Sequence, residues 1–168
     1  MKVFTYYLLL TTFYFLLGLV FFVFYVNGKQ DARSDSPVLE IRDTDSGRIY
    51  GRWPLEEGEE FAVEFVHSVN QSPVREIFVN EGGEMRLRAL RFYSFGAGMP
   101  FDFDVSGGRT LELRHDEGAM MITGFSVSFR GLNYIVGTVS DHLLLINGKM
   151  VSLRDLCGRN AHITMRIR

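Results

Sequence analysis

Residues 143–153, Leu-Leu-Leu-Ile-Asn-Gly-Lys-Met-Val-Ser-Leu, decide the fold class, because they place two apolar runs on either side of a two-residue turn. Leu143–Ile146 and Lys149–Leu153 both have the length of a β-strand. Asn147-Gly148 tolerates the positive φ angles of a type I′ turn, a common connection in β-hairpins. The stretch therefore predicts two antiparallel strands joined by a tight turn.

The same pattern extends along the chain from Val38 to its carboxyl end. Apolar runs of roughly four to eight residues alternate with turn signals about every ten residues. No stretch after Val26 keeps an apolar stripe of helical period over about three turns. We therefore expect an all-β domain, an antiparallel β-sandwich or barrel-like fold, over residues 38–168. The turn signals are Asp45-Ser46-Gly47, Glu57-Gly58, Gly82-Gly83, Gly107-Gly108, Glu117-Gly118, Asn133 and Asn147-Gly148.

Alternation within two runs predicts which side chains face the core. Side chains of a strand point to opposite faces with a period of two. Phe61, Val63, Phe65 and His67 therefore share one face of their strand. In the last strand, one face carries Ile163, Met165 and Ile167, and the other carries His162, Thr164, Arg166 and Arg168.

The amino-terminal run Phe4–Val26 contains 23 residues and no charge. A helix of this length, rising ~1.5 Å per residue, covers the ~30 Å hydrocarbon layer of a bilayer. We expect one transmembrane anchor in residues 1–27, a polar tether in residues 28–37 and the β-domain outside the cytoplasm. A cleaved signal peptide is the alternative, but its apolar region is usually shorter, roughly 7–15 residues.

Charge and residue types exclude several functions. After Val26 the chain carries 17 basic and 20 acidic residues, which is too acidic for a nucleic-acid-binding surface. Cys157 is the sole cysteine, so an internal disulfide is excluded. We expect no cofactor and no metal, because the histidines lack the close spacing that brings two ligands together. The histidines are His67, His115, His142 and His162.

Two motifs go beyond general strand chemistry: His67–Glu76, with the sequence His-Ser-Val-Asn-Gln-Ser-Pro-Val-Arg-Glu, and Ser94–Pro100, with the sequence Ser-Phe-Gly-Ala-Gly-Met-Pro. In this order they resemble a bacterial family of unassigned function, domain-of-unknown-function family 1850. The later pieces Val136-Gly137, Asp141-His142-Leu143 and Ile146-Asn147-Gly148 look similar to the closing strands of that family.

The resemblance implies a partner. Members of the family are similar in having an amino-terminal hydrophobic segment and a small domain, and their genes commonly lie beside those of TAXI-type TRAP transporters. Such transporters import carboxylates with an ion gradient and an extracytoplasmic solute receptor. The resemblance therefore implies a membrane-anchored accessory subunit that contacts the transporter's membrane subunits or the solute receptor.

The first motif supplies four candidate site residues, His67, Ser68, Pro73 and Glu76. If strands ending at His67 and beginning at Val74 form a hairpin, His67 lies opposite Val74 and diagonally beside Glu76. An imidazole beside a carboxylate is suited to acid–base chemistry or metal binding. The same pair also neutralises two polar groups at the edge of a core, and we favour this structural interpretation.

The second motif supplies the candidates Ser94, Phe95, Gly96, Gly98 and Pro100. The motif lacks the strand-to-helix setting and the Lys-Ser/Thr of a P-loop. The two glycines instead allow tight turns or the close approach of another backbone. The apolar side chains around them form a docking patch if they are exposed, or part of the core if they are buried.

Two functions follow from the sequence. The first is a non-enzymatic accessory or interaction subunit of a TAXI-type TRAP transporter, held in the cytoplasmic membrane by one helix. The second is an extracytoplasmic β-domain that binds or hydrolyses a small ligand with the His67/Glu76 pair. Ser68, Ser94 and Ser126 lack a Gly-x-Ser-x-Gly elbow, which argues against a serine hydrolase.

Overall fold

The computed structural model describes residues 36–69, 71–93, 104–105, 109–137 and 140–168. The predicted anchor in residues 1–27 and most of the tether lie outside these residues, as does the motif Ser94–Pro100. Within the described residues, none of the helices is both long and apolar enough to cross a membrane. Residues Pro37–Arg168 form one unit, which is described below.

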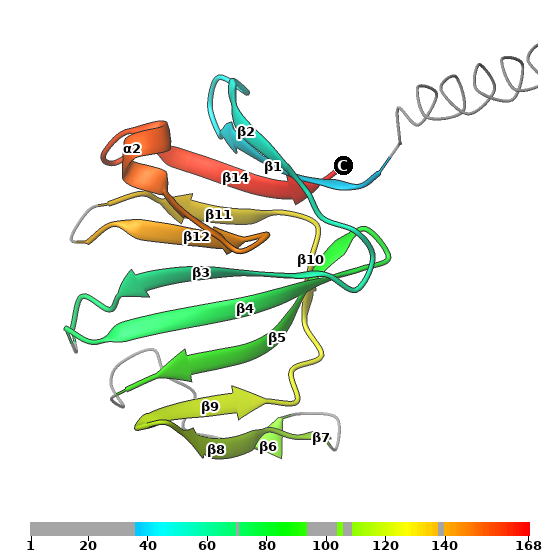
Figure 1. Ribbon diagram of the computed structural model, residues 1–168, viewed down its shortest axis with the longest axis vertical. Coiled ribbons are helices and arrows are strands. Elements are labelled where there is room, and N and C mark those ends of the chain that lie inside the picture. Colours follow the sequence, from blue (N-terminus) through cyan, green and yellow to red (C-terminus); the bar gives the residue numbers. More distant parts are fainter. Residues whose placement is uncertain (1–35, 70, 94–103, 106–108, 138–139) are drawn as a thin grey trace, which may run out of the picture. The chain divides into compact units, whose positions relative to one another are not determined.

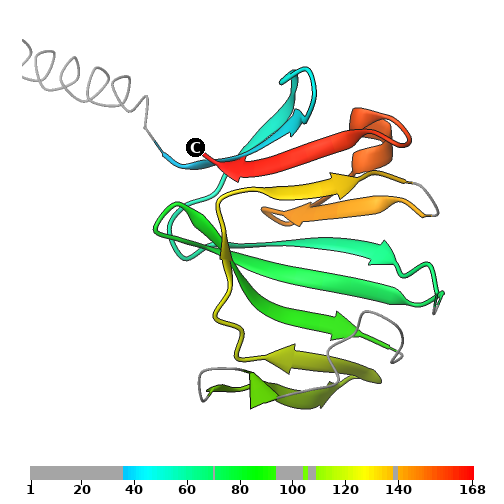
Figure 2. The same cartoon turned by 180° about the vertical axis from the view of Figure 1, so that it is seen from behind.

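Two antiparallel sheets make up most of this unit (Figures 1 and 2). The four-stranded sheet has the order β11 (Leu132–Ile135), β14 (His162–Ile167), β1 (Val38–Asp43) and β2 (Ile49–Pro54). The second, longer sheet has the order β13 (Lys149–Ser152), β12 (His142–Ile146), β3 (Glu60–Val66), β4 (Pro73–Glu81), β5 (Glu84–Phe92), β9 (Ala119–Thr123) and β8 (Glu112–Asp116).

Four short elements among the described residues complete the unit. β10 (Ser128–Phe129) pairs with β5, and β6 (Asp104–Val105) pairs with β7 (Arg109–Thr110). The short helix α2 (Leu153–Cys157) follows β13. Every strand pairing is antiparallel, so the prediction of an all-β fold is confirmed.

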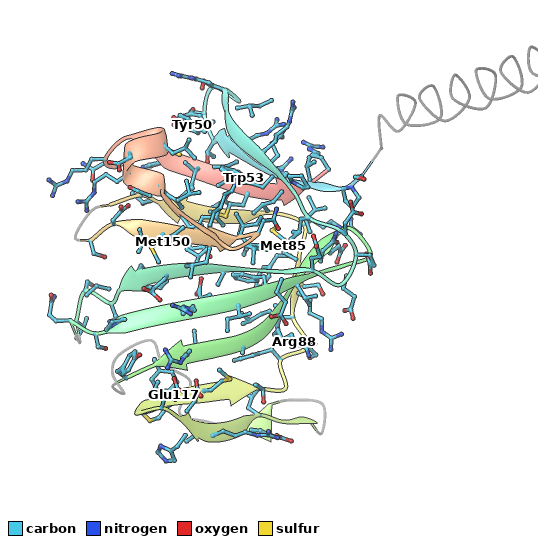
Figure 3. The ribbon with its side chains drawn as sticks, in the orientation of Figure 1. Tyr50, Trp53, Met85, Arg88, Glu117 and Met150 are labelled. Atoms are coloured by element: carbon cyan, nitrogen blue, oxygen red, sulfur yellow. The ribbon has the colours of Figure 1, made fainter. Side chains whose placement is uncertain are left out.

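The main core is built from both sheets, as in a β-sandwich. Leu39 and Ile41 of β1 and Met165 of β14 pack in the same cluster as Phe61 and Val63 of β3. Trp53 of β2 packs against this cluster and Met85 of β5 belongs to it; both are labelled in the side-chain view (Figure 3). The other buried members are Leu55, Phe78, Val136, Leu144, Ile146, Leu153 and Ile163.

A second, smaller core lies farther along the long sheet. It contains Val74 of β4, Phe92 of β5, Leu111 immediately before β8, and Ile122 of β9. Phe65 of β3 packs against both clusters. One part of the long sheet therefore packs against the four-stranded sheet, and the part beyond it has a separate apolar cluster.

The hairpin that decided the fold class is confirmed. Ile146 pairs with Lys149, and Asn147 and Gly148 have φ angles of 51° and 68°. The second strand ends at Ser152, one residue before the predicted end at Leu153. It ends there because the Ser152 hydroxyl caps α2 by accepting a hydrogen bond of 3.0 Å from the backbone nitrogen of Asp155.

The predicted alternation in β14 is confirmed with one informative exception. Ile163 and Met165 are fully buried, and Arg166 is exposed. Thr164 faces away from the core, yet it is only 6% exposed. Its hydroxyl donates a 2.7 Å hydrogen bond to Asn133 and lies 3.0 Å from the hydroxyl of Thr44, so neighbouring strands cover it.

Asn80 of β4 fixes the crossing from β2 to β3. Its side chain is 1% exposed, and its amide nitrogen donates a 2.8 Å hydrogen bond to the carbonyl of Leu55, the residue after β2. Its side-chain oxygen accepts a 3.2 Å hydrogen bond from Gly83 in the β4–β5 turn. One buried amide thus ties together two connections that are distant in the sequence.

Candidate functional site

The β3–β4 hairpin contains the first candidate motif, and its loop is shorter than predicted. Phe65 pairs with Val74, and Val63 pairs with Glu76, so the predicted register is wrong by two residues. The backbone nitrogen of His67 donates to the carbonyl of Ser72 at 2.9 Å and closes a shorter loop.

The reason for this register lies within the loop. The backbone nitrogen of Gln71 donates a 2.9 Å hydrogen bond to the carbonyl of His67. Gln71 has a φ of 53°, which turns the chain sharply enough for Ser72 to pair with His67. The loop between His67 and Ser72 is therefore shorter than the predicted loop Ser68–Pro73.

This register separates the predicted pair of His67 and Glu76. Because Glu76 lies opposite Val63, the two residues share a face but stand four strand positions apart, about 13 Å. The Nδ1 atom of His67 instead accepts a 3.3 Å hydrogen bond from the backbone nitrogen of Val69. The imidazole thus helps to hold the loop.

The remaining candidates of the motif line the same hairpin. Ser68 is exposed, and its carbonyl accepts a 2.6 Å hydrogen bond from the Gln71 side chain. Pro73 is exposed and pairs with Val66 at the beginning of β4. The candidates Ser94, Phe95, Gly96, Gly98 and Pro100 lie outside the described residues.

Glu76 has its partner in the other sheet. Its side chain is half-buried, and its Oε2 atom accepts a 2.7 Å hydrogen bond from the hydroxyl of Tyr134. Glu76 belongs to β4 in the long sheet, and Tyr134 belongs to β11 in the four-stranded sheet. The bond therefore links the two sheets at the side of the sandwich where β3 ends and β4 begins.

His142 completes an inter-sheet cluster of Phe65, Glu76, Tyr134 and His142. Its ring stacks on Phe65 with a centroid distance of 5.2 Å and meets the Tyr134 ring edge-on at 5.8 Å. Its Nδ1 atom accepts a 3.3 Å hydrogen bond from the backbone nitrogen of Gly137. Because Nδ1 is an acceptor here, the neutral imidazole carries its proton on Nε2.

Burial shifts the ionisation of all three polar members. It raises the pKa of Glu76, although the hydrogen bond from Tyr134 acts in the opposite direction. It also lowers the pKa of His142, against the attraction of Asp141, and raises the pKa of Tyr134, where the negative charge of Glu76 adds to the effect. The cluster therefore favours the neutral form of each group.

The chemistry open to this cluster is limited. A carboxyl with a raised pKa near a neutral imidazole can take part in proton transfer. The phenol of Tyr134 and the carboxyl of Glu76, however, already satisfy each other, as buried polar groups in a structural network do. Within the described ranges, we find no group of three or more His, Cys, Asp or Glu side chains placed to hold a metal ion.

Sequence reasoning identified Glu76 but assigned it the wrong neighbour. Tyr134 and His142 lie 58 and 66 positions beyond it, and nothing in their local pattern connects them to β4. The one available signal is the piece Asp141-His142-Leu143, which resembles part of the family's closing strands. The register of β12 on β3, where His142 pairs with Phe65, places that piece beside the cluster.

Comparison with known proteins gives one match. A family model described as "Domain of unknown function (DUF1850)" matches residues 61–153, which include β3, β4 and both strands of the β12–β13 hairpin. No curated protein matches the chain. No solved structure matches it either.

Proposed function

The chain belongs to the DUF1850 family, and on this premise we propose that it is a membrane-anchored, non-enzymatic accessory subunit of a TAXI-type TRAP transporter. In this proposal the run Phe4–Val26 is the anchor, and the β-domain lies outside the cytoplasm. The partners are the membrane subunits of the transporter or its solute receptor, and the transported solutes are carboxylates.

One observation supports the interaction role: strand register places the first motif, the later family piece around His142 and the strand that precedes the second motif at the same end of the long sheet. Val74, within the first motif, pairs with Phe92, two residues before the second motif begins at Ser94. His142, within the later family piece, pairs with Phe65 on the other side of β3. The ends of β3 and β5 and the start of β4 lie together at this end of the sheet (Figures 1 and 2).

This end of the long sheet presents apolar side chains to solvent. Val69 at the tip of the β3–β4 hairpin is 66% exposed, and Tyr93 after β5 is 45% exposed. Isolated exposed apolar residues are common, but Val69 lies within the first motif and Tyr93 immediately precedes the second. Contact with a partner protein is the use that fits such residues, because burying them there stabilises a complex.

The internal contacts of the inter-sheet cluster fit the same role. Tyr134 and Glu76 satisfy each other across the sheets, and His142 is held between two aromatic rings. Such contacts fix the position of β3 and β4, and so support the hairpin that carries Val69. The polar residues of the motif then maintain the structure of the surface that contacts the partner.

Purification of the tagged full-length chain from native membranes in mild detergent tests this proposal. We expect a multi-spanning permease to co-purify with it, and V69D to reduce the recovery of that permease. The matched control is M150D, because Met150 is 61% exposed but lies in β13, near the opposite turn. Recovery of a folded chain without a transport protein, or equal losses from both variants, would count against the proposal.

A ligand-binding or hydrolytic domain is a second candidate function, favoured by one observation. Glu76 is a half-buried carboxyl whose pKa burial raises, and such groups concentrate at functional sites. His67 is too far along the strand to be its partner, so His142 is the nearer imidazole on this proposal. E76A would then leave a folded chain without ligand affinity, whereas the accessory role predicts mainly a loss of stability.

A further inference from the structure

The outer face of the four-stranded sheet is strongly basic. Leu39, Ile41 and Met165 point into the core, so the residues that alternate with them in β1 and β14 point away from it. We call these outward residues, with Arg52 of β2, the arginine face. Its charged members are Glu40, Arg42, Arg52, Arg166 and Arg168.

Glu40 organises this face. It is 1% exposed, and its Oε2 atom accepts a 2.8 Å hydrogen bond from Nε of Arg52. Its Oε1 atom accepts hydrogen bonds from Arg42, and Nε of Arg168 lies 3.7 Å from the same oxygen. Although burial raises it, these arginines hold the pKa of Glu40 below its usual value, so the carboxylate stays charged.

One carboxylate does not neutralise the four guanidinium groups. Arg166 lies directly opposite Glu40 in the β1–β14 register, yet it forms no ion pair with an acidic residue among the residues that the structure describes. The side chains of the face therefore carry a net charge of +3, from four arginines and one glutamate. Arg52 and Arg168 are 56% and 50% exposed, so this charge is open to solvent.

A groove beside Arg166 extends the basic surface. It has a volume of ≈ 620 Å³ and runs from the β4–β5 turn to the end of β14. Arg130, Arg166 and Arg168 line it, together with the polar side chains of Asn133 and Thr164. Arg130 is 91% exposed and pairs with Glu84 at 2.7 Å, so that pair adds no net charge at the rim.

We propose that the arginine face binds the phosphate groups of anionic phospholipids at the membrane surface. The proposal rests on the anchoring role proposed above for Phe4–Val26. The planar guanidinium group offers several donors in a fork that matches phosphate oxygens. The arginines also spread over three neighbouring strands of an open sheet face, which suits a planar array of headgroups better than one enclosed small anion.

The position of β1 in the chain supports a lipid occupant. Val38 follows Val26 by twelve positions, so an anchor ending at Val26 keeps β1 within about 40 Å of the bilayer even when the intervening chain is fully extended. A tether of this kind gives the face a high effective concentration at the lipid surface. Each arginine near an anionic membrane surface then strengthens binding by roughly fivefold.

The test measures the rate of arginine modification by phenylglyoxal in the full-length chain. The chain is inserted into nanodiscs of phosphatidylcholine alone or with phosphatidylglycerol, and modified peptides are quantified by mass spectrometry. We expect the modification of Arg52 and Arg168 to be slowed roughly fivefold or more by the anionic lipid at low salt, and less at high salt. Arg88, which projects from β5 in the long sheet, should react equally in both discs (Figure 3).

Two single variants make the test specific. R166Q removes a charge that pairs with no described acidic residue, so it leaves the Glu40 network intact and should weaken the protection of Arg52 and Arg168. R114Q is the matched control, because Arg114 is 72% exposed in β8 and pairs with Glu112. Equal effects of R166Q and R114Q would overturn the proposal.

Other outcomes identify a different occupant or a different failure. Equal reactivity in both kinds of disc would overturn lipid binding, and so would protection by free inorganic phosphate in phosphatidylcholine discs. Protection in native membranes but not in anionic discs would instead indicate an acidic protein. A chain that fails to insert into any disc contradicts the anchor; the arginine face is then tested by adding the free chain to phosphatidylglycerol vesicles.

Discussion

Replacing Tyr134 with phenylalanine tests whether the inter-sheet cluster stabilises the sandwich. The substitution removes the hydroxyl that donates a 2.7 Å hydrogen bond to Glu76 and keeps the ring that meets His142. A hydrogen bond to a neutral carboxyl contributes about 1 kcal/mol, and one to a carboxylate about 2 kcal/mol. We therefore expect Y134F to lower the free energy of unfolding by about 1 kcal/mol at pH 4 and about 2 kcal/mol at pH 8.

The sign of the pH dependence follows from Glu76. Burial raises its pKa in the folded chain, so the folded state holds the proton more tightly than the unfolded state. This contribution to stability is present below the unfolded pKa and is lost as the pH rises through the folded pKa. Loss of the Tyr134 hydroxyl raises the folded pKa further, so Y134F should steepen the decline, whereas E76Q should remove it.

Urea unfolding at several pH values, followed by the fluorescence of Trp53, measures these changes. Trp53 is the sole tryptophan of the chain and packs against the main core, so its emission reports loss of the sandwich. In the E76Q background, Y134F should cost about 1 kcal/mol at every pH. A cost of Y134F that is the same at pH 4 and pH 8, or unchanged by E76Q, would refute the coupling of Tyr134 to Glu76.

Three further substitutions test the framework around the site. N80A should lower the free energy of unfolding by about 2–4 kcal/mol in urea denaturation, because the carbonyl of Leu55 and the backbone nitrogen of Gly83 lose their partner. G148A should cost about 1–2 kcal/mol in the same assay, since a φ of 68° strains any residue with a Cβ. E40Q should destabilise the chain most near neutral pH and least in acid, because the low pKa of Glu40 confers stability that disappears as the pH falls through it; thermal denaturation at pH 3 and pH 7 measures the difference.

Local pattern was sufficient to predict several strands of the β-domain. The hairpin around Asn147-Gly148 and the alternation in β14 depend on neighbours within a few residues, and both are observed. The helix α2 was missed because five residues are too few to show a helical period. Its signal was the Ser152 cap, which an apolar strand pattern conceals.

The site depended on contacts that the sequence does not reveal. The distance between His67 and Glu76 followed from a register, and the positive φ of Gln71 moved that register by two residues. Tyr134 reaches Glu76 because β11 pairs with β14 in one sheet and faces β4 of the other. Such a contact depends on how the two sheets pack, which periodicity within one strand cannot specify.

The arginine face could also be predicted only in part from the sequence. The sequence places Arg166 and Arg168 together on one face of the last strand, and this is observed. Their proximity to Glu40 and Arg52 arises only when β14, β1 and β2 lie side by side. The basic patch is therefore invisible in a chain whose overall charge is negative.

The central claim, that a retained amino-terminal helix holds the β-domain outside the cytoplasm, is tested by thiol labelling of the membrane-bound chain. Cys157 is a poor reporter, because burial raises the pKa of its thiol to about 11. Exposed Lys149 in β13 is a better position, so the measurement uses K149C in a C157S background with a membrane-impermeant maleimide on spheroplasts. We predict rapid labelling of a chain that stays in the membrane fraction after an alkaline wash; labelling that requires lysis, or a chain beginning near Lys29 in the wash, would contradict the account.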